Sequence, residues 1–296
     1  MKLFGKKAQP KKEEPAVLTL YACRKDGKAV PDIACRLFAD VMDKIFYTDE
    51  DEFQIRFKDG KASTTILDRE VNEKEADRER KMRSIAILKE KGIPFLEHLK
   101  ASVFESECKI PDKEVIIHRL ACIFTACVQS EFYTSGQFKN CREMAAEEIA
   151  QMEERYQISE WLSPEERDYL ENPDKDPALH NRFGWRYECC SVLLWALSMM
   201  ELNEPTEICD ASELGAVMWN HTFDSLMETA VLRSRDEILD MQDLVLRYDW
   251  ACVDARVHHK EVPMLNSDIV FEWHYALNWL VQADGIADWD RVTTTT

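Results

Sequence analysis

The chain has 296 residues, which is enough for one large domain or for a large and a small one. Hydrophobic residues make up 45% and charged residues 32%, a globular composition that excludes a fully disordered chain. The formal net charge is −18, although the first twelve residues carry five lysines and no acid. Because so acidic a surface repels phosphates, we expect no nucleic-acid binding.

The cysteines indicate a reducing compartment. Of the ten, Cys122, Cys127, Cys189, Cys190 and Cys252 lie in apolar runs, where a thiol behaves as a small hydrophobic group. The opening MKLFGKKAQPKK lacks the apolar region of a signal peptide. No Cys-x-x-Cys occurs, and no Cys/His group has zinc-finger spacing. We therefore expect a cytoplasmic protein with reduced thiols and without structural zinc.

No membrane association is expected. The longest uncharged apolar run has about a dozen residues, fewer than the ~20 that span a bilayer. Neither end carries a lipidation motif. The sequence predicts a soluble protein.

The N-terminal quarter predicts a disordered basic tail at 1–16 and a small α+β unit at 17–72. In that unit AVLTLYACRKDG is strand-like and ends in an Asp-Gly turn signal. Residues 31–46 have apolar side chains at helical spacing. Residues 53–67 alternate on both sides of another Asp-Gly pair, which predicts a hairpin. The charged segment DREVNEKEADRERK follows as a linker.

From residue 78 to residue 296 the pattern is helical throughout, and we expect an all-helical domain. The helix RERKMRSIAILKEKG should end at Gly92, and Asp112 should open the next long helix. Three capping boxes mark further helix starts: Ser163 with Glu166, Asp210 with Glu213, and Ser234 with Glu237. The predicted fold class is mainly α, with a multi-helical C-terminal domain and the small α+β unit before it.

Acidic residues are concentrated between residues 147 and 176. This segment contains eleven acids and three bases. One interpretation is a solvated face that keeps the protein soluble. The other is a surface that attracts a basic protein partner.

Nine polar residues occupy the most apolar helices of the chain. An uncharged run extends from Cys189 to Met200, with two opposite charges at its start. A buried ion without a partner costs several kcal/mol, so the nine should meet one another. We expect Arg186 and Glu188 to contact opposite charges among the other polar side chains of the cluster. The candidate cluster consists of Arg186, Glu188, Asp240, Asp243, Arg247, Asp254, Glu272, His274 and Asn278.

Two interpretations of the candidate cluster stay open. It could be a salt-bridge and hydrogen-bond network that fixes the register of the helices. Alternatively, Asp240, Asp243, Glu272 and His274 could act as acid/base or metal-binding groups in a pocket. The chain contains no Gly-x-Ser-x-Gly, no phosphate-binding glycine loop and no His-x-x-x-His. The sequence therefore identifies no catalytic residue, cofactor or metal.

Four motifs, in order, are similar to those of one bacterial family. They are RKMRSIAILKEKGIP, GWRYECCSVLLWALSMMELNEPTEICD, LRSRDEILDMQDLVLRYDWACVDAR and HYALNWLVQADGIADWDRVTTTT. Over about residues 78–296 the chain resembles domain-of-unknown-function family four-two-seven-two. The resemblance implies a helical, cytoplasmic bacterial protein, brings no activity, and places the candidate cluster within the family's motifs. This chain departs from the family in having Trp273 in place of an arginine and in lacking an aspartate among its terminal threonines.

The sequence favours a non-enzymatic protein-interaction module, of an adaptor or immunity-like kind, that covers a basic partner. The alternative is an enzyme, or a binder of a small ligand or metal, that uses the candidate cluster. A pocket open to solvent at the cluster would favour the alternative, and a closed network would favour the interaction module.

Overall fold

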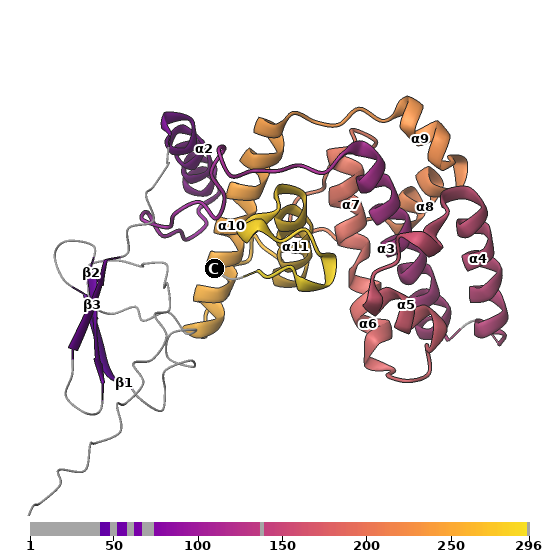
Figure 1. Cartoon of the computed structure of the whole chain (residues 1–296), viewed down its shortest axis with the longest axis horizontal. Helices are drawn as coiled ribbons and strands as arrows, with labels where there is room; N and C mark the ends of the chain where they lie inside the picture. Colours follow the sequence, from indigo (N-terminus) through magenta and orange to yellow (C-terminus); the bar gives the residue numbers. More distant parts are fainter. Residues whose placement is uncertain (1–41, 48–51, 58–61, 67–73, 137–138, 295–296) are drawn as a thin grey trace, which may run out of the picture. The chain divides into compact units, whose positions relative to one another are not determined.

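The computed structural model divides the chain into two compact units, Met1–Val71 and Asn72–Thr296 (Figure 1). The residues that the structure describes are 42–47, 52–57, 62–66, 74–136 and 139–294.

Three antiparallel strands are described in the first unit: β1 (Met42–Tyr47), β2 (Glu52–Phe57) and β3 (Ala62–Ile66). Their order is β1-β2-β3. Strand β1 lies where the end of a helix was expected, so the helix expectation for 31–46 is wrong at residues 42–46. This segment ends in isoleucine, phenylalanine and tyrosine, which suit a strand, and it pairs with β2 along its length. The expected tail at 1–16 and the expected first strand lie outside the described residues.

The second unit is built from helices, which confirms the prediction of a mainly helical fold. Short 3₁₀ turns at Ile158–Glu160, Ala283–Gly285 and Trp289–Arg291 accompany them. The helices are α2 (Glu75–Lys91), α3 (Lys113–Thr134), α4 (Cys141–Tyr156), α5 (Pro164–Glu171), α6 (Ala178–Trp185), α7 (Tyr187–Ala196), α8 (Ala211–Asn220), α9 (Phe223–Thr229), α10 (Arg235–Val257) and α11 (Ser267–Val281).

Local capping chemistry sets several helix ends. Ser163 and Ser234 form reciprocal capping boxes at the starts of α5 and α10, as predicted. Gly92 ends α2 in the left-handed conformation at φ 67°. Asp210 caps α8 through the backbone N–H of Ser212, and no return bond from Glu213 closes the predicted box. The sequence therefore locates these ends to within a residue.

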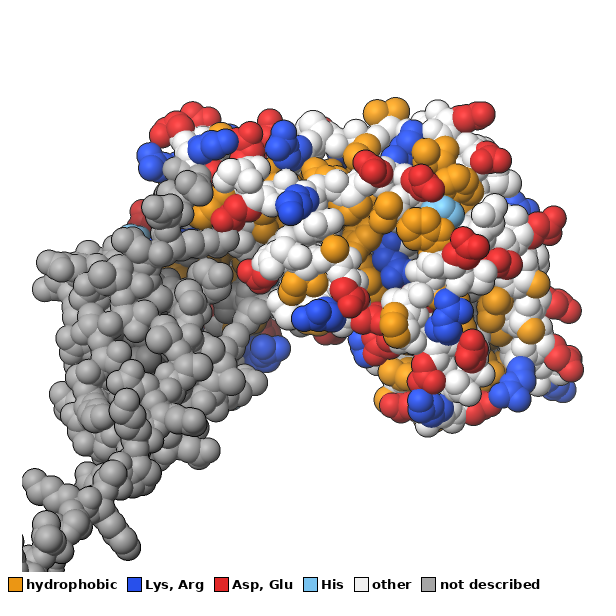
Figure 2. Space-filling view, in the orientation of Figure 1, with side chains coloured by type: hydrophobic (Ala, Val, Ile, Leu, Met, Phe, Trp, Pro, Cys, Tyr) orange, Lys and Arg blue, Asp and Glu red, His pale blue; other side chains and the backbone are white. Residues whose placement is uncertain are grey.

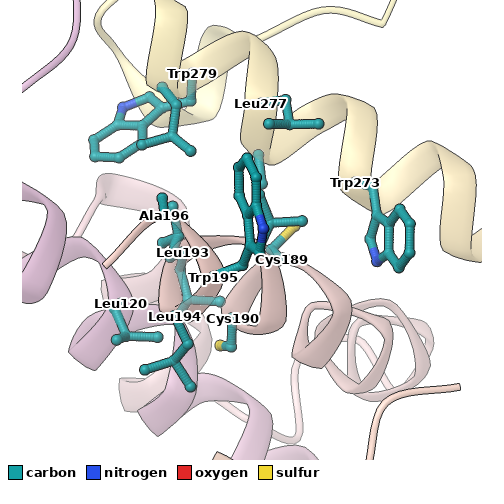
Figure 3. Close-up of a cluster of buried hydrophobic side chains, with 14 of the residues drawn as sticks. Leu120, Cys189, Cys190, Leu193, Leu194, Trp195, Ala196, Trp273, Leu277 and Trp279 are labelled. Carbon is teal, nitrogen blue, oxygen red and sulfur yellow. The ribbon is translucent and has the colours of Figure 1, made fainter. Parts of the chain in front are cut away.

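Helix α7 forms the centre of the core. All ten of its residues are buried, because it packs between α3 and α11. Figure 3 shows Leu193 and Leu194 of α7 beside Leu120 of α3, with Leu277 and Trp279 on α11. The run from Cys189 onwards therefore lacks charge because it has no face turned to solvent.

Helix α3 is also enclosed by the fold. It is the one helix among the described residues that is long and apolar enough, by length and composition, to cross a membrane. Its most apolar window is 89% buried inside the domain, against α4, α5, α6, α7 and α9. That burial is typical of the core helix of a globular domain.

Helices α10 and α11 form an antiparallel pair joined by residues 258–266. Gln242 contacts Asn278, whereas Asp249, later on α10, contacts His274, which comes earlier on α11. The two helices therefore run in opposite directions. Helix α2 packs on α10 as well. The polar residues of α10 and α11 therefore contact several different elements and do not all face one another.

Candidate functional site

The nine residues of the candidate cluster do not meet at one point. They lie on α7, α10 and α11 and at the junction of α6 with α7, and each is held by a local partner. Seven of them are buried, and Asp240 and Asp254 are half-buried. The geometry of each group determines whether it is closed or open to a ligand.

Arg186 and Glu272 form a closed buried ion pair. Arg186 Nη1 lies 2.8 Å from Glu272 Oε2, and both side chains are almost fully buried. The guanidinium carbon lies 3.8 Å from the ring centroid of Tyr275 and 5.6 Å from that of Trp289. Burial by itself lowers the pKa of Arg186, but the neighbouring Cys189 and Glu272 outweigh it and raise the pKa overall. This pair is packed against aromatic rings and presents no free face.

Cys189 completes this group as a hydrogen-bond donor. Its thiol lies 3.0 Å from Glu272 Oε2 and is fully buried. Burial, and after it the charge of Glu272, raises the pKa of Cys189 well above its usual value. The thiol therefore stays neutral and unreactive.

Glu188 has partners that the sequence did not suggest. We expected an opposite charge, but its two oxygens instead accept from the backbone N–H of Cys209 at 2.8 Å and from Trp273 Nε1 at 2.9 Å. The expectation of an ionic partner for Glu188 was therefore wrong. Two N–H donors satisfy a buried carboxylate through charge-assisted hydrogen bonds.

Asp243 and Arg247 pair with each other one turn apart on α10. The two bonds, at 2.9 and 2.7 Å, form a bidentate contact in which both side chains are 1% exposed. Arg247 also donates to the carbonyl of Leu99 at 3.2 Å. This arrangement ties α10 to the segment that follows α2.

Asp240 and Asp254 lie nearer the surface. Asp240 accepts from Arg80 at 3.2 Å and from Arg83 at 2.7 Å, which links α10 to α2. Asp254 pairs with His258 at 3.2 Å near the end of α10. The contacts of Asp240 therefore join two helices at their surfaces, and the contact of Asp254 stabilises the end of α10.

His274 contacts Asp249, which was not among the candidates. The Nδ1 of His274 lies 2.9 Å from Asp249 Oδ2, and the imidazole has no exposed surface. Its Nε2 has no hydrogen-bond partner among the described residues. One turn further along α11, Asn278 accepts from Gln242 at 3.0 Å and donates to the carbonyl of Thr293 at 2.8 Å.

A cavity of about 570 Å³ lies beside this Asp249–His274 pair. Asp249, Val253 and Arg256 of α10 line it on one side, and Phe271 of α11 lines it on the other. None of the nine residues of the candidate cluster is among the residues that line this cavity, and His274 hydrogen-bonds to one that is, Asp249. Within the described part of the chain, no group of three or more His, Cys, Asp or Glu side chains is placed to hold a metal ion.

The part of the chain that carries these residues matches one family model. The model described as a domain of unknown function (DUF4272) matches residues 80–292. The chain belongs to this family. The match confirms the resemblance, and no curated protein and no solved structure matches the chain.

The DUF4272 domain contains a further buried ion pair that sequence reasoning missed. Arg119 of α3 donates to Glu166 of α5 at 2.7 Å, and both side chains are buried. Burial raises the pKa of Glu166, and Arg119 opposes that shift. Glu166 was recognised only as the second half of a capping box. Its second role could have been suspected because Arg119 is a lone cation in the apolar run of α3.

Proposed function

We propose that this DUF4272 domain is a non-enzymatic protein-interaction module that binds a basic segment of a partner, in the manner of an adaptor or immunity protein, in the cytoplasm. One observation carries the proposal: a row of exposed carboxylates on α4 that has no cationic partner among the described residues. The buried polar groups, by contrast, are used within the fold.

The row consists of Glu143, Glu147 and Glu154, which lie on one face of α4 because they are four and seven residues apart. All three are exposed, and among the described residues none has a hydrogen bond or ion pair. They extend along ~16 Å of helix. Buried Met152 and Tyr156 fix the opposite face of α4. Figure 2 shows acidic side chains along the edge of the helical unit where Figure 1 places α4.

Other acids in the same segment are already paired. Glu165 contacts Arg182, Asp168 contacts Lys175 and Asp174 contacts Arg142. The row on α4 is therefore available to a partner while these carboxylates are partly neutralised. Unpaired surface charge of one sign steers an oppositely charged partner and makes association sensitive to salt.

The test is a binding titration with a synthetic helical peptide that carries lysines at positions i, i+4 and i+11. We expect binding at low salt that weakens as the salt concentration rises. The triple variant Glu143→Lys/Glu147→Lys/Glu154→Lys should abolish it. The matched control, Glu207→Lys/Glu213→Lys/Glu228→Lys, changes the net charge equally at exposed sites that are not on α4. Equal weakening by both variants, or no binding by the wild type, would rule the proposal out.

The alternative, a small-ligand binder, has support at one place only. Arg186, Glu188, Asp243, Arg247 and Glu272 are engaged inside the fold, so they offer no open group. The Asp249–His274 pair differs, because Asp249 lines a cavity.

A further inference from the structure

Asp249 is a buried carboxylate that lacks a cation. Its side chain is 8% exposed, and its only partner among the described residues is His274, which holds one of its two oxygens. Four other buried carboxylates of the domain are paired with arginine: Asp77 with Arg80, Glu166 with Arg119, Asp243 with Arg247, and Glu272 with Arg186. A fifth, Glu188, has no cation, but an N–H group donates to each of its two oxygens. Asp249 differs from all five, because a single hydrogen bond reaches only one of its oxygens.

His274 satisfies only one of the two oxygens of Asp249. A carboxylate can only accept, so Nδ1 of His274 donates to Oδ2 at 2.9 Å. Nε2 of His274 has no hydrogen-bond partner among the described residues. The other oxygen of Asp249 is left as an unused acceptor at the wall of a cavity.

The cavity has the size of a small-ligand site. Its volume of about 570 Å³ lies within the usual range for such pockets, about 300 to 1,000 Å³. Cys252 and Val253 of α10 and Phe271 of α11 give it an apolar wall beyond Asp249. The lining also contains two cations and two further acids, so with Asp249 the acids outnumber the cations: Arg256, Lys260, Glu261 and Asp268. Burial raises the pKa of Cys252 to about 12, with a further contribution from Asp249, so its thiol is neutral at this wall. Phe271 is 43% exposed at the cavity, which is unusual for a large apolar residue.

We infer that the cavity between α10 and α11 binds a ligand with a primary ammonium group followed by a short apolar stretch. The ammonium sits on the free oxygen of Asp249 and supplies the direct cationic partner that this carboxylate lacks among the described residues. The apolar stretch lies against Val253 and Phe271. The inference is independent of the basic partner proposed for α4, because the two surfaces share no residue.

Two sources present this chemistry: a small aliphatic amine and the free amino terminus of a peptide. Calorimetric titration with butylamine, with the tripeptide Ala-Leu-Ala and with its N-acetylated form distinguishes them. Binding of the free tripeptide but not the acetylated form assigns a peptide terminus. Binding of butylamine without the tripeptide assigns a small amine. No binding of any probe at about 10 mM, or equal binding of the acetylated and free tripeptides, overturns the inference.

Variants locate the site. Asp249→Asn should weaken binding of the active probe about tenfold or more, because it removes the charge and keeps the shape. Asp254→Asn is the matched control: the same change on the same helix, at a residue that does not line the cavity. Phe271→Ala, at an exposed position, should also weaken binding. Wild-type affinity in Asp249→Asn would overturn the assignment, and so would equal losses in the Asp249 and Asp254 variants.

Discussion

Glu272 and His274 lie two residues apart on α11, and each is buried against a side chain that can carry the opposite charge, yet their surroundings differ. Arg186 covers Glu272, and Tyr275 and Trp289 pack around the guanidinium. Asp249 holds His274 but borders a cavity on its other side. The difference teaches that burial of a polar pair does not by itself mark a site. What matters is whether the charges of the pair neutralise each other and whether one of its polar atoms is left free to bind a ligand.

The largest expected effect comes from breaking the closed pair. Arg186→Met leaves Glu272 buried without its cation, which should lower the free energy of unfolding by about 3 to 5 kcal/mol. Urea denaturation followed by circular dichroism measures it. The double variant Arg186→Met/Glu272→Leu should recover most of the loss, since no uncompensated charge is left. A single variant as stable as the wild type would show that the pair is dispensable.

A second prediction uses two buried histidines that lack a carboxylate partner. Burial lowers the pKa of His118, which stacks on Trp161 and Phe223, and lowers that of His180. Both pKa values are lower in the folded state than in the unfolded state. The stability that the two neutral histidines contribute is therefore fully present above about pH 6.5, and it is lost as the pH falls through their folded-state pKa values. The melting temperature should therefore fall on acidification below that pH.

The variant His118→Phe checks the cause, because it keeps the stack and removes the titrating group. Its melting temperature should depend less steeply on pH than that of the wild type. An unchanged slope would show that His118 does not contribute to acid sensitivity.

A smaller effect is expected at a helix end far from either pair. Ser234→Ala removes the side-chain acceptor that caps α10 at Glu237, and should cost about 1 kcal/mol of stability. Ser234→Asp retains an acceptor and serves as the control. If alanine and aspartate give the same stability in urea, the cap is not what holds this end of α10.

The smallest effect is expected at Asp240, which joins α10 to α2 near the surface. Its side chain is 40% exposed, so Asp240→Asn should cost no more than about 1 kcal/mol. Denaturation at low and high salt should show a difference between wild type and variant that shrinks with salt. A loss as large as that of Arg186→Met would place Asp240 among the closed pairs.

The sequence predicted what depends on local chemistry. The boxes at Ser163 and Ser234 and the stop at Gly92 require only residues a few positions apart, and the structure contains them. The apolar run after Cys189 likewise indicated a helix with no solvent face. The candidate positions could be chosen because a charge in an apolar helix stands out.

The pairing within the cluster depends on register between helices, which a single sequence does not contain. Asp249 lies six residues after Asp243, off the face that Asp243 shares with Arg247, so it was not grouped with them. Only the antiparallel contact of α10 with α11 brings it to His274. The donors to Glu188 were missed for a related reason, because a backbone N–H carries no sequence signal.

The most direct test of the contrast between the two groups is the stability of two charge-removing, isosteric variants, Glu272→Gln and Asp249→Asn, measured side by side in urea. Glu272→Gln should lose several kcal/mol, because it leaves Arg186 buried without an anion. Asp249→Asn should stay within about 1 kcal/mol of the wild type, or exceed it, because it removes a buried charge that has no cation. Equal, large losses in both variants would contradict the account, since Asp249 would then be as structural as Glu272.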